Sequence, residues 1–478
     1  MSENIQKSPL PCGGGLGVGE TQSIKQGYKQ TSLGILPQEW EVVRLGEVCF
    51  VQSGGTPPKN EKSYWENGTI KWLGSSVCKN LHYIDEITDF ITEKGLQNSS
   101  AKIFKQGTTL IALVGATIGK VAFLNFEATT NQNIAGIYPQ DEKKLNQTFL
   151  FYISLMLHKE FIRLSSDKFK MANLSFIKSL QIPLPPLAEQ EKIAQILGVW
   201  DKGISVLKSL IEAKTKRKKA LMQRLLTPPT HPLTLSAREG EQKSHHDTKA
   251  PPLAGGVGVG YSHIENNRND DKVLDCHDLT ASNLAMTEKD NKAKQSLRFA
   301  EFTDKWQEMR LGDICEIYQP QTIPQSDFTK EGYNVYGANG IIGKYHSYNH
   351  EKEQIAIACR GNSCGAVNFT NPKSWITGNA MVINLDNSKN ADKIFVYYVL
   401  LNSNLNYLVT GSGQPQITSN VKNHSIKLPT LAEQKKIAQV LSACDKEIEF
   451  LKSKFQCLKT QKKGLMQRLL NGEVRVKC

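Results

Sequence analysis

Two stretches of the chain, 187–226 and 431–473, repeat apolar side chains at alternating intervals of three and four residues. This spacing lines the apolar positions along one side of a helix and is typical of the a and d positions of a coiled coil. The seam positions are Ile193, Leu197, Ile204, Leu207, Leu221 and Leu225 in the first stretch, and Ile437, Leu441, Ile448, Leu451, Leu465 and Leu469 in the second. We expect two long helices that pair as an antiparallel coiled coil, with the seam interrupted at Lys214, Lys218 and Lys462.

The two stretches are copies of one another. LAEQEKIAQILGVWDKGISVLKS at 187–209 reappears as LAEQKKIAQVLSACDKEIEFLKS at 431–453, and 23 of the 40 positions aligned from 187 and from 431 are identical. A proline-containing segment precedes each copy, which favours a helix start at that point. The chain therefore contains an internal duplication.

A globular block lies before each helix, at 31–186 and at 297–430. The blocks begin alike, WEVVRLGEVC at 40–49 and WQEMRLGDIC at 306–315, but their interiors diverge. Strand-like runs at 110–124 and 355–369 share glycines at 115 and 119 and at 361 and 365, and an aromatic helix is expected near 146–164 and near 391–408. The sequence thus predicts an α+β fold with two globular domains, two long helices and an internal pseudo-twofold repeat.

Two segments show no periodicity. Residues 1–30 and 227–296 are rich in Gly, Pro and charge, so we interpret the first as a low-complexity tail and the second as a flexible linker.

The charge is concentrated on the helices. The sequence has 59 Lys and Arg against 46 Asp and Glu, a formal net charge of +13, which predicts an anionic partner such as a nucleic acid. Residues 187–226 and 431–470 each carry nine basic and four acidic residues. The run KTKRKK at 214–219 is either a solvated helical face or a surface for phosphates or an acidic subunit. The blocks are nearly neutral, so DNA binding there would depend on local clusters and base contacts.

Motifs for independent catalysis are missing from the sequence. We find no P-loop, no methyl-donor motif and no nucleophile elbow, so we expect no catalytic residue and disfavour a fused nuclease. The ten cysteines form no C-x-x-C pair, which fits a reducing cytosol. His346, His350, Cys359 and Cys364 are near one another in sequence, but their spacing is not that of a zinc finger, and we expect no metal site. The chain shows no signal peptide and no apolar run of ~20 residues, so we expect a cytoplasmic protein.

The chain resembles the specificity (S) subunit, HsdS, of type I restriction-modification enzymes. The resemblance rests on PLPPLAEQ at 183–190 and LPTLAEQ at 428–434, each behind an unlike domain, and on domain starts at 53–77 and 334–345. It implies two target-recognition domains that bind a bipartite double-stranded DNA target. It also implies two methyltransferase (M) and two restriction (R) subunits, which would hold S-adenosylmethionine, ATP and Mg. A coiled-coil scaffold without DNA recognition is the alternative.

Candidate DNA contacts are found in loops and turns. Arg360 and Asn362 occupy the second glycine turn, where Arg can pair with guanine O6 and N7 and Asn with adenine N6 and N7. An ordinary turn is the alternative for both. The other candidates, as loop positions able to reach phosphates or bases, are Lys59, Lys62, Lys168, Lys170, Lys344 and Gln416.

Overall fold

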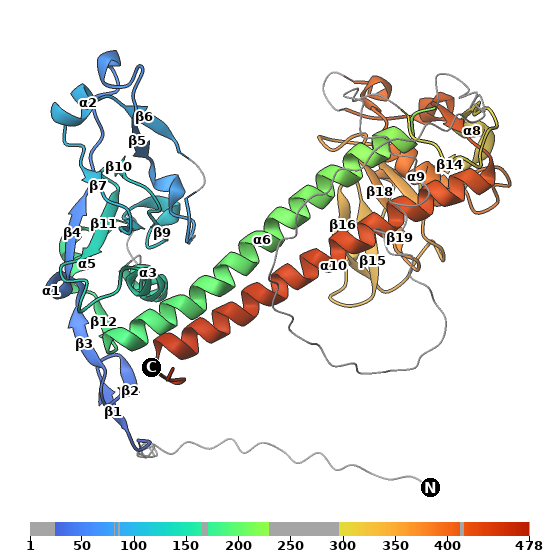
Figure 1. The fold of residues 1–478 in the computed structure, drawn as a ribbon. Coiled ribbons are helices and arrows are strands. Elements are labelled where there is room, and N and C mark those ends of the chain that lie inside the picture. The colour runs from blue at the N-terminus through green and yellow to red at the C-terminus, as the bar shows by residue number, and fades with distance from the viewer. Residues whose placement is uncertain are drawn as a thin grey trace, which may run out of the picture. The chain divides into compact units, whose positions relative to one another are not determined.

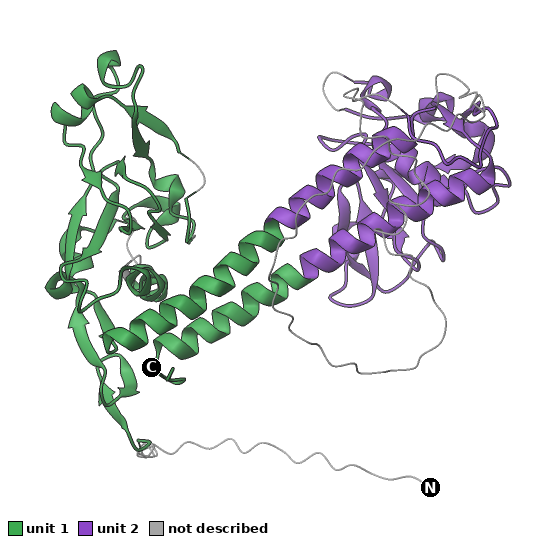
Figure 2. Cartoon of the chain, viewed as in Figure 1, with its two compact units in different colours: residues 1–208, 454–478 green, residues 209–453 purple. Residues whose placement is uncertain are grey.

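The computed structural model describes residues 24–80, 82–84, 87–164, 171–228, 296–411 and 415–477. They form two compact units (Figure 2): unit 1 comprises the described residues within 1–208 and 454–478, and unit 2 those within 209–453. The predicted α+β fold with two long helices is confirmed (Figure 1). The sequence pattern sets each helix apart as a segment of its own, whereas the compact units divide both helices between them.

The globular block of unit 1 contains two four-stranded sheets. One has the order β4-β11-β8-β9 and is antiparallel throughout, and the other has the order β6-β5-β10-β7 with β5 and β10 parallel. The strands are β4 (Cys49–Ser53), β5 (Ile70–Leu73), β6 (Asp89–Ile91), β7 (Ile103–Phe104), β8 (Thr109–Ala112), β9 (Val121–Phe123), β10 (Ala128–Thr130) and β11 (Ile134–Pro139). Every residue of β8 is buried, which explains its unbroken apolar run.

Short helices and a strand pair connect this block to the long helix. β3 (Glu41–Arg44) pairs with β12 (Gln181–Leu184), the strand that leads into α6 (Leu187–Leu225). The remaining helices are α1 (Leu45–Val48), α2 (Glu93–Gln97), α3 (Gln147–Met156), α4 (His158–Leu164) and α5 (Leu174–Ser179). Asn146 caps α3 by accepting from the Thr148 and Phe149 amides. The buried face of α3 belongs to the same core as the first turns of α6.

The globular block of unit 2 repeats the first sheet and changes the second. The order β14-β20-β17-β18 matches β4-β11-β8-β9, but the second sheet has three strands, β16-β15-β19. β13 (Gln307–Arg310) pairs with β21 (Ser425–Leu428), as β3 pairs with β12. The other elements are α8 (Leu311–Ile314), β14 (Glu316–Tyr318), β15 (Tyr333–Gly337), β16 (Gly340–Tyr345), β17 (Ile355–Ala358), β18 (Val367–Phe369), β19 (Trp375–Ile376), β20 (Ala380–Asn384) and α9 (Lys393–Asn402). The two blocks therefore share one frame and differ mainly in the second sheet, β6-β5-β10-β7 in unit 1 and β16-β15-β19 in unit 2, which we call the outer sheet.

The long helices α6 and α10 (Leu431–Leu470) pack against each other inside each unit. In unit 1 the start of α6 shares a core with the end of α10, through Leu197 and Leu469 among others. In unit 2 the end of α6 shares a core with the start of α10, through Leu225 and Leu441 among others. Within each unit the pairing is therefore antiparallel. Of the predicted seam positions, Ile204, Leu221, Leu451 and Leu465 are half-buried and the others are buried.

The predicted low-complexity tail, 1–30, is wrong at its end. β1 (Tyr28–Thr31) forms a hairpin with β2 (Gly34–Pro37), and the Tyr28 hydroxyl donates to the Gly472 carbonyl at 3.0 Å. A long-range partner, which local composition does not reveal, orders this strand. Residues 1–23 and 229–295, most of the predicted tail and linker, lie outside the described residues. No helix in the described part of the chain is long and apolar enough to span a membrane.

Candidate nucleic-acid interface

Both blocks contain the predicted glycine turn, between β8 and β9 and between β17 and β18. Gly115 has φ 70° and Gly119 φ 71°, and Gly361 and Gly365 have φ 77° and 91°. These left-handed conformations suit glycine, which has no Cβ to clash. The amide of the second glycine donates to the last residue of the preceding strand at 2.9 Å in unit 1 and at 2.8 Å in unit 2. The glycine alignment between the two copies thus corresponds to one repeated backbone structure.

A second chain segment crosses each turn and forms an isolated antiparallel bridge with it. The bridge joins Val114 to Met171 in unit 1 and Arg360 to Gln416 in unit 2. Next to each bridge is a second backbone hydrogen bond. The Ala172 amide donates to the Leu113 carbonyl at 2.8 Å in unit 1, and the Ile417 amide donates to the Cys359 carbonyl at 3.1 Å in unit 2. We call each pair of bridged residues the bridge pair. The two bridge pairs occupy the same backbone position and differ completely in chemistry.

The bridge pair of unit 2 borders a cavity of about 250 Å³. Besides Arg360 and Gln416, its polar lining comprises Tyr318, Gln319, Thr418, Ser419 and Lys422. Of the described residues that line it, none is acidic, and two are basic. Arg360 is exposed, and its side chain makes no hydrogen bond or ion pair with another residue in the described part of the chain. The cavity thus presents positive charge together with amide and hydroxyl groups, as a nucleic-acid contact requires.

The structure places the other predicted contacts elsewhere or does not describe them. Asn362 is exposed in the same turn as Arg360 but does not line the cavity. Lys344 is exposed on β16, in the outer sheet of unit 2. In unit 1, Lys59 is exposed in a turn, and Lys62 is exposed 3.9 Å from the Glu66 carboxylate. The two other candidates, Lys168 and Lys170, lie outside the described residues. Arg360 and Gln416 are therefore the pair that the structure brings together.

Sequence reasoning missed Lys422, although a signal for it exists. Its equivalent in unit 1 is Lys178, because both side chains pack over the glycine of the short helix, Gly312 and Gly46 respectively. The two lysines are separated by 244 positions, the offset of the long helices. An alignment of the segments just before β12 and β21, the strands that precede the long helices, pairs Lys178 with Lys422.

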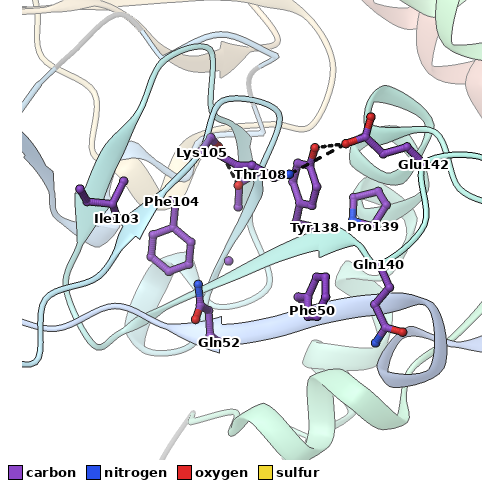
Figure 3. A pocket seen from close by; sticks show the side chains of 11 residues that line it. Phe50, Gln52, Ile103, Phe104, Lys105, Thr108, Tyr138, Pro139, Gln140 and Glu142 are labelled. Atoms are coloured by element: carbon purple, nitrogen blue, oxygen red, sulfur yellow. Dashed lines mark hydrogen bonds and ion pairs between the residues drawn. The ribbon is translucent and has the colours of Figure 1, made fainter.

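A second cavity, of about 490 Å³, lies in unit 1 on the β4 and β11 strands (Figure 3). The Lys105 ammonium lies 3.5 Å from the centroid of the Tyr138 ring, and the Tyr138 hydroxyl donates to Glu142. This hydrogen bond holds the pKa of Glu142 below its ordinary value. Burial, followed by the same carboxylate, raises the pKa of Tyr138. Because the Glu142 carboxylate faces this cavity and repels another anion, the cavity is less suited to a phosphate than the cavity of unit 2.

Repeated polar contacts attach each block to both long helices. In unit 1 the Tyr152 hydroxyl of α3 donates to Asp201 at 2.7 Å, and Lys462 of α10 pairs with the same carboxylate. In unit 2 Tyr398 of α9 donates to Asp445 at 2.7 Å, and Lys218 of α6 pairs with it. Burial raises the pKa of both tyrosines. Lys218 and Lys462, which interrupt the predicted seam, thus bind the partner helix.

The basic run at 214–219 is divided between two roles. Lys214 pairs with Glu447 at 2.6 Å, and Lys218 pairs with Asp445, so both side chains lie against α10. Lys216, Arg217 and Lys219 are exposed. Neither a solvated face nor a partner surface describes the whole run, because two of its charges are used in helix pairing.

The LAEQ segments close each unit. Glu189 accepts two hydrogen bonds from Arg475, at 2.7 and 2.9 Å, and one from the Trp40 indole at 2.9 Å. Glu433 accepts two from Arg298, both at 2.9 Å. The two glutamate side chains are 2% and 1% exposed. Each arginine follows the other long helix in sequence, so each LAEQ segment fixes the chain segment that follows the helix packed beside it.

The glutamine of each LAEQ segment makes a matching set of contacts. Gln190 donates to the Lys144 and Pro185 carbonyls at 2.8 Å and accepts from the Asn146 amide at 2.9 Å. Gln434 makes the equivalent three bonds to residues 390, 429 and 392. A single buried side chain thereby joins the start of the long helix to the cap of the aromatic helix.

The fold and these contacts define a duplicated protein in which one frame presents two different sets of exposed side chains. Residues 37–214 and 303–460 match the family described as type I restriction modification DNA specificity domain. The chain belongs to this family of specificity subunits.

Curated relatives and a solved structure agree with this assignment. The type I restriction enzyme MjaVIII specificity subunit of Methanocaldococcus jannaschii is 22% identical over 92% of this chain and 94% of its own length. The MjaIX specificity subunit of the same organism is 32% identical over 41% of this chain and 44% of its own length. The fold is similar to the crystal structure of a type I restriction-modification S subunit from M. genitalium, with a TM-score of 0.53 and 15% identity over 90% of this chain and 96% of that one.

Proposed function

We propose that the chain binds a bipartite double-stranded DNA sequence, with one half-site read by each globular block. The repeated frame supports this proposal most directly, because the same turn and bridge carry Val114 and Met171 in one block and Arg360 and Gln416 in the other. Base readout requires different side chains on a constant scaffold if two unlike half-sites are to be recognised.

We also propose that two methyltransferase and two restriction subunits assemble on this chain. Val199 and Val206 on α6 and Phe450 on α10 are exposed apolar side chains that helix pairing leaves uncovered. Such side chains suit docking of a partner subunit, here the methyltransferase. S-adenosylmethionine, ATP and Mg would then be held by the partners, and this chain would supply no catalytic residue. A role on intracellular DNA implies a cytoplasmic location.

The alternative function is a scaffold that does not recognise a DNA sequence. Such a protein needs the helix contacts but has no need for unlike exposed side chains on equivalent turns. Adding the purified chain to cognate methyltransferase subunits separates the two functions. We expect methylation of a defined bipartite sequence with the complex and none with the chain alone. Methylation by the chain alone, or methylation by the complex without sequence preference, would contradict the proposal.

Replacing residues 297–430 by the corresponding block of a relative tests whether the two blocks read independently. The joining helices and the LAEQ contacts stay in place, so we expect one half of the methylated sequence to change and the other to remain. Sequencing of methylated genomic DNA measures both halves at once. A change in both halves would show that the blocks do not read separately.

A further inference from the structure

Backbone hydrogen bonds hold the bridge pairs in place, and the Thr410 hydroxyl adds a bond of 3.3 Å to the Gln416 carbonyl. Gln416 is anchored on both sides, since its backbone also exchanges hydrogen bonds of 2.9 and 2.8 Å with Thr410. Residues opposite each other in an antiparallel bridge project to the same face of the sheet, with Cβ atoms about 5 Å apart. Arg360 and Gln416 can therefore be substituted without loss of these backbone contacts, whereas Val114 also packs, half-buried, against the core of unit 1.

We infer that the bridge pair is a specificity-determining position in each recognition domain. This inference rests on the proposed function, and it assigns base classes to the four residues. Arg360 pairs with the O6 and N7 atoms of a guanine, and Gln416 pairs with the N6 and N7 atoms of a neighbouring adenine. Val114 and Met171 contact the C5-methyl group of thymine.

The chemistry of unit 2 supports the purine assignment. Arg360 is exposed, and its side chain has no hydrogen-bond or ion-pair partner within the described residues, so the donors of its guanidinium are available. Arginine and glutamine match the major-groove edges of guanine and adenine bidentately. The adjoining cavity carries Lys422 and no acidic side chain among its described lining residues. An anionic backbone can therefore approach while the bridge pair faces the bases.

The chemistry of unit 1 supports the thymine assignment. Neither Val114 nor Met171 offers a strong hydrogen-bonding group, so this pair cannot read a donor and acceptor pattern. Met171 is nevertheless 70% exposed, and Val114 is half-buried. Within the major groove the thymine methyl is the apolar group that distinguishes one base pair from the others. The same frame thus distinguishes a methyl group in one half-site and purine edges in the other.

The test exchanges the two chemistries between the units. The first variant carries Arg360→Val with Gln416→Met, and the second carries Val114→Arg with Met171→Gln. Each is expressed with the cognate methyltransferase subunits, and the methylated genomic sequences are read. Lys389→Val is the matched control, because Lys389 is an exposed cation of unit 2 outside the turn and the cavity.

We expect the first variant to change one or two adjacent positions in the half-site of unit 2 and to leave the other half unchanged. Methylation of the original site should fall about 25- to 20,000-fold, because the variant removes two bidentate base contacts, each of which accounts for about 5- to 150-fold. The second variant should change only the half-site of unit 1, and Lys389→Val should change neither.

Three outcomes would overturn the inference. An unchanged sequence with uniformly slower methylation would mean that Arg360 contacts phosphate and carries no specificity. A change in the half-site of the other unit would also contradict it. A complex with the unmodified chain that methylates no defined sequence would refute the proposed function itself, and the inference with it. Circular dichroism and thermal unfolding of each variant separate these outcomes from a loss of folding.

Discussion

Removing Arg298 should destabilise unit 2 more than removing Arg475 destabilises unit 1. The Glu433 carboxylate is 1% exposed, and its two side-chain hydrogen bonds both come from Arg298, which is itself 16% exposed. Arg298→Ala would leave a buried charge without a partner, which costs about 3–5 kcal/mol. In unit 1, Glu189 keeps the hydrogen bond from Trp40 after Arg475→Ala. Because Arg475 is also 35% exposed, we expect a loss of about 1–2 kcal/mol there.

Amide hydrogen exchange followed by mass spectrometry can measure the two losses separately. The peptides at 297–302 and 431–436 report on unit 2, and those at 187–192 and 472–476 report on unit 1. A loss of 3–5 kcal/mol corresponds to about 150- to 5,000-fold faster exchange wherever opening of the unit limits exchange. The unit 1 peptides of the Arg298→Ala protein serve as the internal reference.

Glu433→Gln distinguishes an unpaired buried charge from lost packing. This variant keeps the shape of the side chain and removes its charge, while Arg298 still donates to the Asp304 carbonyl. We expect it to cost less than Arg298→Ala, about 1–2 kcal/mol. An acceleration below tenfold in unit 2 of Arg298→Ala, or an equal loss with Arg475→Ala, would refute the reasoning.

Three further predictions concern single side chains. Burial lowers the pKa of His82, which faces Asp201, Tyr152 and Lys462, so the unfolded chain binds the proton more readily than the folded one. The exchange protection of unit 1 should therefore fall as the pH drops below about 6.5, by at most ~1.4 kcal/mol per pH unit, and His82→Asn should flatten this profile. Lys462→Met should lower the free energy of unfolding of unit 1 by about 1–3 kcal/mol in chemical denaturation, because it removes a charge-assisted bond to Asp201. Lys463→Met, at the exposed neighbouring position, should lower it by less than about 0.5 kcal/mol, and equal losses would contradict a specific pairing. Lys422→Gln should weaken DNA binding by the assembled complex on all sequences alike and lower the slope of log affinity against log salt by about one, because it removes a contact to a phosphate. An altered sequence preference would show instead that Lys422 reads bases.

The sequence predicts the elements whose signals are local or repeated. The helix seam has a fixed period, and α6 and α10 begin at 187 and 431, where the apolar pattern and the prolines predict their starts. The glycine turn is visible because two copies can be compared. β1 escapes prediction because Tyr28 is ordered by a carbonyl 444 positions away, which no window of composition contains. The cavity at Tyr138 escapes it for the same reason, since its lining comes from three separate strands and the loops beside them.

The duplication also determines which charges meet between the long helices. Asp201 pairs with Lys462 and Asp445 with Lys218, and in each unit the lysine is the copy, 244 positions away, of the lysine that serves the other unit. An antiparallel pairing of two copies requires this exchange. If position i of the first helix meets position j of the second, then position j of the first helix meets position i of the second. Once the pairing of Lys218 with Asp445 is known, the repeat therefore gives the pairing of Lys462 with Asp201. Bridge pairs are different, because the residues joined to Val114 and Arg360 come from segments whose sequences have diverged, and only the backbone shows that they are equivalent.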